Sequence, residues 1–274
     1  MPFSEETHQR AKEIMARYPA GRERSALLPL LHLVQSEEGY VSPDGVAFCA
    51  ELLGINRAQV GAVATFYTMY KRKPTGDYLV SVCTNTMCGV LGGDKTFAAL
   101  SEYLGVGHDE TTDDGLFTLE HAECLAACDY APVLTVNYDF FDGVQADEAL
   151  ALIHQMEQGE RPMPSRGARL CTLKEMSLQL AGFADEREGA VAEGPAGEPT
   201  LRGNRLAERY GIAVQGFDPS TPIPTQADRE AAKAASAQPA EKAGATANKP
   251  AGDAKPAGDS APPKGAADAK QGDK

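Results

Sequence analysis

Apolar side chains recur at helical spacing through the first 70 residues, between short polar and glycine-containing breaks. Ser4 stands before two acidic residues, an arrangement typical of a helix start. Pro29 indicates either a kink or the true first turn of the second helix. Helices are predicted over residues 4–18, 24–39, 42–54 and 56–67. Four helices in so short a stretch indicate a small bundle over residues 1–73.

The periodicity changes after Pro74 to short apolar runs rich in β-branched residues. Strands are predicted over residues 78–82, 116–119 and 133–136, and helices over 94–104 and 146–157. The order is strand, helix, strand, strand, helix. Residues 74–160 therefore indicate a small α/β (α+β) domain in which helices cover a mixed sheet.

The rest of the chain carries weaker patterns. Residues 161–186 begin with a proline-rich stretch and show helical spacing over 172–183, which we interpret as an extended docking segment standing apart from both cores. Residues 187–274 are rich in Ala, Gly, Pro, Asp and Lys, with few aromatic or branched side chains. Such a composition buries too little apolar surface to fold alone, so a disordered low-complexity tail is predicted.

Charge and hydropathy exclude some functions. The net charge of −13 argues against nonspecific nucleic-acid binding, which needs a basic surface. No apolar run approaches the roughly 20 residues of a membrane-spanning helix, and the N-terminus lacks the apolar stretch of a signal peptide. We expect a cytoplasmic protein without direct membrane insertion. In that reducing compartment, its six cysteines are expected to be metal ligands or buried thiols.

Four of the six cysteines form two close pairs. Four residues separate Cys83 from Cys88, and three separate Cys124 from Cys128. Each pair is predicted in a loop near a strand, where backbone N–H groups can reach sulfur. Gly89, Gly92 and Gly93 beside the first pair allow close backbone approach. Thiolates in this pattern favour an iron-sulfur cluster.

Other interpretations of the pairs remain. Structural zinc also takes four cysteines, although zinc sites usually have two-residue spacers in both pairs. A set of buried thiols is the simplest alternative. A thiol-disulfide oxidoreductase would need Cys-x-x-Cys, which this sequence lacks. Cys49 and Cys171 lie outside the pairs and are expected to be packed thiols.

Several motifs together resemble one family. These are the segment from Ser25 to Gln35, Val63-Ala-Thr-Phe-Tyr-Thr-Met-Tyr70, Cys83-Thr-Asn-Thr-Met-Cys88 and Glu123-Cys-Leu-Ala-Ala-Cys-Asp-Tyr-Ala-Pro132. Over residues 25–158 the chain is similar to the E subunit of bacterial NADH-quinone oxidoreductase (complex I) and the mitochondrial 24-kilodalton subunit.

The resemblance implies a helical bundle followed by a thioredoxin-like domain that holds one 2Fe-2S cluster on Cys83, Cys88, Cys124 and Cys128. It implies one-electron transfer beside an FMN- and NADH-binding flavoprotein subunit, with FMN in that partner and no catalytic residue in this chain. The whole would lie peripherally on the cytoplasmic side of the inner membrane, with other peripheral-arm subunits. A subunit of an NAD-dependent formate dehydrogenase or NAD-linked hydrogenase is the alternative within this pattern, and a zinc-stabilised interaction module is the alternative of another class.

The sequence departs from the family pattern at two places. The family commonly has glycine where this chain has Ala126, and long or charged residues where it has Gly89, Val90 and Gly92. Neither change removes a ligand. Both bear on the packing and hydrogen bonding that set a cluster's potential.

Overall fold

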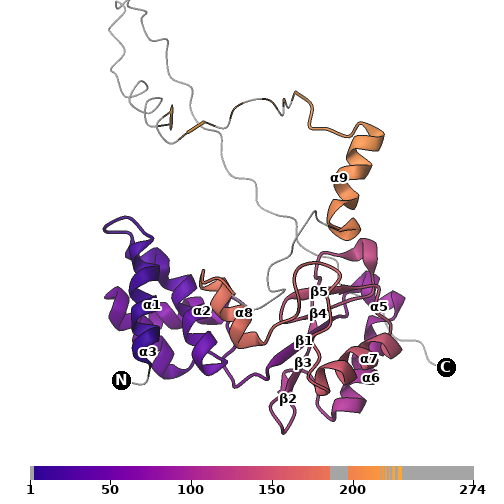
Figure 1. Ribbon diagram of the computed structural model, residues 1–274, viewed down its shortest axis with the longest axis horizontal. Helices are drawn as coiled ribbons and strands as arrows, with labels where there is room; N and C mark the ends of the chain where they lie inside the picture. Colours follow the sequence, from indigo (N-terminus) through magenta and orange to yellow (C-terminus); the bar gives the residue numbers. More distant parts are fainter. Residues whose placement is uncertain are drawn as a thin grey trace, which may run out of the picture. The chain divides into compact units, whose positions relative to one another are not determined.

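The computed structural model describes residues 3–185 and 197–216, with a few single positions up to 229. Contacts group Met1–Ala213 into one compact unit and Val214–Lys274 into another, of which only scattered residues are described. The first unit holds a helical bundle and a sheet, each with its own core (Figure 1).

Capping residues fix the ends of the N-terminal helices. These helices are α1 (Glu5–Ala16), the 3₁₀ turn η1 (Glu23–Ala26), α2 (Leu27–Glu38), α3 (Pro43–Leu53) and α4 (Arg57–Phe66). The Ser4 side chain accepts a hydrogen bond from the Thr7 backbone, and α2 ends at Gly39 in the left-handed conformation. Pro29 lies in the first turn of α2, where its missing N–H costs no helical bond. The four predicted helices are confirmed.

Helix α8 (Leu173–Leu180) completes this bundle, contrary to the expectation that it stands apart from both cores. It packs along α2 (Figure 1), and Ser177 and Ala181 are fully buried. The Gln35 side chain of α2 donates a hydrogen bond to the Ser177 hydroxyl at 3.1 Å. Periodicity in the sequence marked the apolar face of α8 but could not show that α2 covers it.

The second core surrounds a five-stranded sheet. Its strands are β1 (Tyr78–Cys83), β2 (Glu110–Thr111), β3 (Phe117–Ala122), β4 (Val133–Val136) and β5 (Asp139–Asp142), in the spatial order β2-β3-β1-β4-β5. β1 pairs in parallel with β3 and antiparallel with β4, so the sheet is mixed, as predicted. The two-residue β2 and the hairpin partner β5 were not predicted, because such short strands show no periodicity.

The two faces of the sheet are covered differently. Val80 and Val82 of β1 belong to the apolar core shared with α6 (Gly93–Leu104) and α7 (Ala146–Glu157), which lie together on one face (Figure 1). The range of α7 is the predicted one. Ser81 and Cys83 alternate with these valines and therefore belong to the opposite face. That face carries polar groups and Cys83.

A further helix, α9 (Glu198–Tyr210), lies inside the stretch expected to be a low-complexity tail. Composition gave no sign of it, because its arginines and glutamates match those of a solvated segment. The remainder of residues 187–274 falls almost entirely outside the described residues, and the expected disorder there stays a prediction.

Candidate metal centre

The first cysteine pair is buried at the end of the central strand. Cys83 is the last residue of β1, and Cys88 lies in the short helix α5 (Thr86–Leu91) rather than in the loop the sequence predicts. Only 2% and 3% of their surfaces are exposed. Asn85 caps α5 through the Thr86 backbone N–H. The turn from β1 into α5 thus brings the two cysteines into one small buried cluster.

Gly93 makes this turn possible. An added Cβ there would lie 2.3 Å from the Cys83 carbonyl oxygen and 2.9 Å from that of Cys88, closer than real side chains come. The expected role of glycine beside the cysteines is therefore confirmed at Gly93. The close approach is between α6 and the backbone of the cysteine turn.

The second pair lies in the loop between β3 and β4 and is exposed. The Sγ atoms of Cys124 and Cys128 are 3.9 Å apart, and the Ala126 backbone N–H points at the Cys124 sulfur at 3.4 Å. Ala126 adopts a left-handed conformation with φ of 58°. Glycine would take this conformation without strain, whereas alanine adopts it at some cost.

Cys83 and Cys88 pack against Ala127, which directly precedes Cys128 in the loop of the second pair. Burial raises the pKa of Cys88 to about 11, and a hydrogen bond with Cys83 and repulsion from the Cys83 and Cys128 sulfurs act in the same direction. A hydrogen bond from the Val133 backbone opposes this rise. The pKa of Cys128 is raised first by its hydrogen bond with Cys124. Because metal binding takes thiolates, a metal would displace the protons these sulfurs hold.

A two-iron cluster takes four thiolates, which two close pairs of cysteines can supply. Cys83 and Cys88 lie in a small apolar cluster with Val133 and with Ala127, the residue before Cys128. Backbone N–H groups at sulfur stabilise the negative charge of such a centre. Among residues 3–185 and 197–216, no three His, Cys, Asp or Glu side chains are grouped for a single metal ion.

The comparison with protein families decides the identity of the chain. The model of the family described as thioredoxin-like [2Fe-2S] ferredoxin matches residues 11–157, more than half of the sequence. The chain belongs to this family. A 2Fe-2S cluster is accordingly its cofactor, and the thioredoxin-like fold expected for residues 74–160 is that of the family.

Relatives within the thioredoxin-like [2Fe-2S] family are similar over most of this chain. The E subunit of NADH-quinone oxidoreductase from Mycobacterium tuberculosis is 55% identical over 212 residues, 77% of this chain and 81% of that protein. NADH-quinone oxidoreductase subunit 2 of Thermus thermophilus is 36% identical over 59% of this chain and 90% of its own length. This chain is thus a member of the family of NADH-quinone oxidoreductase E subunits, and so is related to subunits of an oxidoreductase complex.

Among solved structures, an NAD⁺-reducing [NiFe]-hydrogenase in the H₂-reduced state is similar at 20% identity and a TM-score of 0.45. That match covers 50% of this chain and 23% of the hydrogenase chain. No helix of the described residues is long and apolar enough to cross a membrane.

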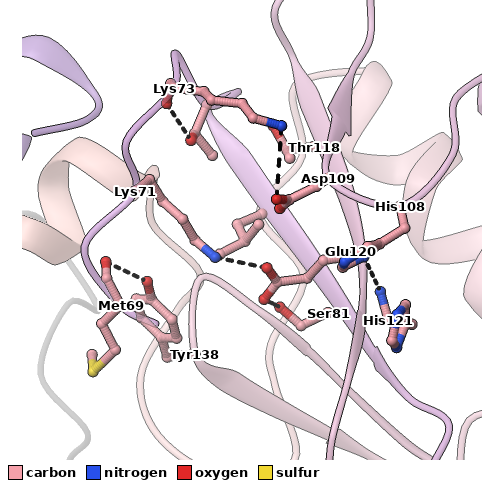
Figure 2. A network of polar contacts seen from close by, with 12 residues as sticks. Met69, Lys71, Lys73, Ser81, His108, Asp109, Thr118, Glu120, His121 and Tyr138 are labelled. Carbon is pink, nitrogen blue, oxygen red and sulfur yellow. Dashed lines mark hydrogen bonds and ion pairs between the residues drawn. The ribbon is translucent and has the colours of Figure 1, made fainter. Parts of the chain in front are cut away.

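A polar network beside the cysteines was not predicted from the sequence. In Figure 2, Lys71 reaches from the segment after the bundle to Glu120 of β3, whose second oxygen accepts a hydrogen bond from Ser81 of β1. Tyr138 donates to the Met69 carbonyl at 3.2 Å, which holds the same segment against the sheet. The only local indication of this network in the sequence is Glu120, a carboxylate directly after the apolar run 116–119.

The remaining cysteines are packed, as expected. Cys49 lies in the bundle core and Cys171 precedes α8, and both are buried. Burial raises the pKa of each thiol to about 12.

Proposed function

We propose that Cys83, Cys88, Cys124 and Cys128 hold the 2Fe-2S cluster, and that the chain transfers single electrons as a subunit of an NADH-quinone oxidoreductase. The observation that carries this proposal is the packing of Cys83 and Cys88, at the end of β1, against Ala127, which directly precedes Cys128 in the loop of the second pair.

Each part of the site has a task in electron transfer. The bound cluster supplies the chemistry of taking up and releasing one electron. Cys83 and Cys88 exclude water from one side because they are buried. Ala126 and Val133 provide backbone hydrogen bonds to sulfur, which favour the thiolate form. Cys124 and Cys128 are exposed and leave the other side open to a partner.

The partner proposed is the FMN- and NADH-binding flavoprotein subunit, within a complex on the cytoplasmic side of the inner membrane. A cleft of about 820 Å³ runs between residues 64–73 and the loop that bears Cys124. Phe66, at the end of α4 beside this cleft, is 78% exposed, and aromatic side chains are common anchors of interfaces. The bundle, braced by α8, would then fix the distance between the cluster and the flavin.

The ligand set is tested by single substitutions in the full chain. Alanine at each of the four positions is expected to abolish the iron and sulfide content and the visible absorption of the purified protein. Cys49→Ala and Cys171→Ala are the matched controls and retain both, since they remove buried thiols outside the site. A Cys88→Ala protein with full iron and sulfide would contradict the assignment. Zinc in place of iron would favour a structural metal site.

The docking surface is tested at its exposed aromatic. Phe66→Asp is expected to reduce co-purification of the chain with the flavoprotein subunit while the cluster content stays unchanged. Tyr210→Asp, which alters an aromatic residue that is 67% exposed on α9, is the control and leaves assembly intact. Normal assembly of the Phe66 variant would remove this surface from the proposed interface.

A further inference from the structure

The polar face of the sheet carries a nearly buried ion pair close to the proposed ligands. The Lys71 Nζ atom lies 2.6 Å from Glu120 Oε2, and the Ser81 hydroxyl donates to Glu120 Oε1 at 2.7 Å (Figure 2). Only 13% of the Lys71 side chain and 17% of the Glu120 side chain are exposed. Water therefore screens these two charges weakly, and their fields extend to neighbouring groups.

Strand geometry places this pair next to Cys83. Ser81 is the register partner of Glu120, and two residues further along, Cys83 is the partner of Ala122. Side chains two residues apart on a strand point to the same face and are separated by about 6.6 Å along it. Glu120 and Cys124 also line the same cleft. Because adjacent strands lie about 4.8 Å apart, Glu120 and Cys83 are diagonal neighbours on the same face, with backbones roughly 8 Å apart.

The Glu120 carboxylate stabilises the fold, but its negative charge opposes reduction of a nearby cluster. By binding Lys71, Glu120 ties the segment after the bundle to the sheet, as Tyr138 does through Met69. A cluster with four thiolates is already negative, at about −2 when both irons are ferric. An uncompensated negative charge nearby would oppose the arrival of one more electron.

We propose, building on the ligand set assigned above, that Lys71 is the counter-charge that keeps Glu120 from lowering the reduction potential of the cluster. The ion pair then sets the potential in addition to anchoring the segment. Removing one member leaves the charge of the other uncompensated. The two single substitutions therefore shift the reduction potential of the cluster in opposite directions. Removing both restores a neutral site.

The test is a charge cycle on the cluster-loaded full chain, with the midpoint potential measured by spectroelectrochemical titration. Lys71→Met is expected to lower the reduced-to-oxidised ratio at fixed potential about tenfold, which is a shift of about 59 mV for one electron. Glu120→Gln is expected to raise the ratio by a similar factor. The double variant returns to within about threefold of the unmodified protein, and Lys71→Arg does the same because it keeps the charge.

The matched control is the neighbouring pair of Lys73 and Asp109. These charges are 3.8 Å apart, but their side chains are 72% and 50% exposed, so solvent screens them. Lys73→Met is expected to change the ratio less than twofold. Shifts of the same sign in Lys71→Met and Glu120→Gln, or shifts no larger than that of Lys73→Met, would overturn the proposal.

Two further measurements distinguish a failure of this proposal from a failure of the ligand assignment or of folding. Iron and sulfide content is determined for every variant, because a failure of the ligand assignment appears there and in the cysteine series. The urea midpoint shows whether a variant is folded. Should Lys71→Met not fold, Glu120→Gln must still titrate at a higher potential than the double variant, and equal potentials would refute the role of Lys71.

Discussion

Gln35 is the side chain whose replacement is expected to loosen the bundle from the segment that leads to the sheet. It is fully buried in α2. Its Nε2 donates to the Met69 carbonyl at 3.0 Å and to the Ser177 hydroxyl at 3.1 Å, and its Oε1 accepts from the Lys71 backbone at 2.8 Å. One amide thus joins α2, α8 and the segment that carries Lys71.

Gln35→Met keeps the length of the side chain but removes all three hydrogen bonds. The partners stay inside the protein, and a buried polar group left without a partner costs about 1–3 kcal/mol. Ser177 can reorient its hydroxyl, and the Met69 carbonyl keeps its hydrogen bond from Tyr138, so the Lys71 N–H accounts for most of the loss. The lost bond to Met69 adds about 1 kcal/mol, and the added apolar surface returns about 1 kcal/mol. We expect unfolding to require about 2 kcal/mol less free energy.

The measurement is urea unfolding of the full chain, followed by far-ultraviolet circular dichroism. With a slope of about 1–3 kcal/mol per molar urea, the midpoint should fall by about 0.7–2 M. Ser177→Ala, which deletes one of the three partners, is the control and should cost about 1 kcal/mol. A loss below about 1 kcal/mol for Gln35→Met would show that this amide does not hold the three elements together.

Three further changes have expected outcomes. Ala126→Gly should raise the free energy of unfolding by about 1 kcal/mol in urea titrations, since glycine adopts the positive φ without strain. Gly93→Ala should cost more than about 2 kcal/mol and reduce cluster content, because its Cβ would meet the Cys83 carbonyl, whereas Gly61→Ala in α4 has open space and should stabilise slightly. Burial raises the pKa of Asp139 to about 6, so the folded state binds its proton more tightly than the unfolded chain does, and this unfavourable contribution to stability grows as the pH rises from about 4 through 6. Asp139→Asn should therefore stabilise the protein by about 1–2 kcal/mol at pH 7.5 and by little at pH 4, and an equal gain at both pH values would exclude the ionisation of Asp139 as the cause.

The elements that the sequence predicts well have strong local determinants. Caps at Ser4, Ser42 and Asn56 and the left-handed glycines Gly39 and Gly54 fix the ends of the bundle helices. These contacts span three or four residues, so they can be read without knowledge of the fold. Helix α7, whose apolar face follows helical spacing for three turns, was predicted over its full range for the same reason.

The elements that the sequence missed depend on partners distant along the chain. Strand β5 is defined by its pairing with β4, and α5 is a single short helix within the cysteine turn. Segment 172–183 has an apolar face in the sequence, but only the packing of α8 on α2 shows that this face belongs to the bundle core. The local hydrophobic pattern of a segment does not show which distant element buries its apolar face.

Local patterns were enough to predict a helical bundle followed by a mixed sheet and to single out the four cysteines of the candidate site, because helix caps, periodicity and ligand spacing are read along the chain. Folding decides that Cys83 and Cys88 are buried while Cys124 and Cys128 are exposed, since that difference depends on how the loop after β3 lies against the end of β1. It also decides the pairing of Lys71 with Glu120, residues far apart in the chain. A charge becomes weakly screened, and so able to act on a neighbouring centre, only when the fold removes it from water.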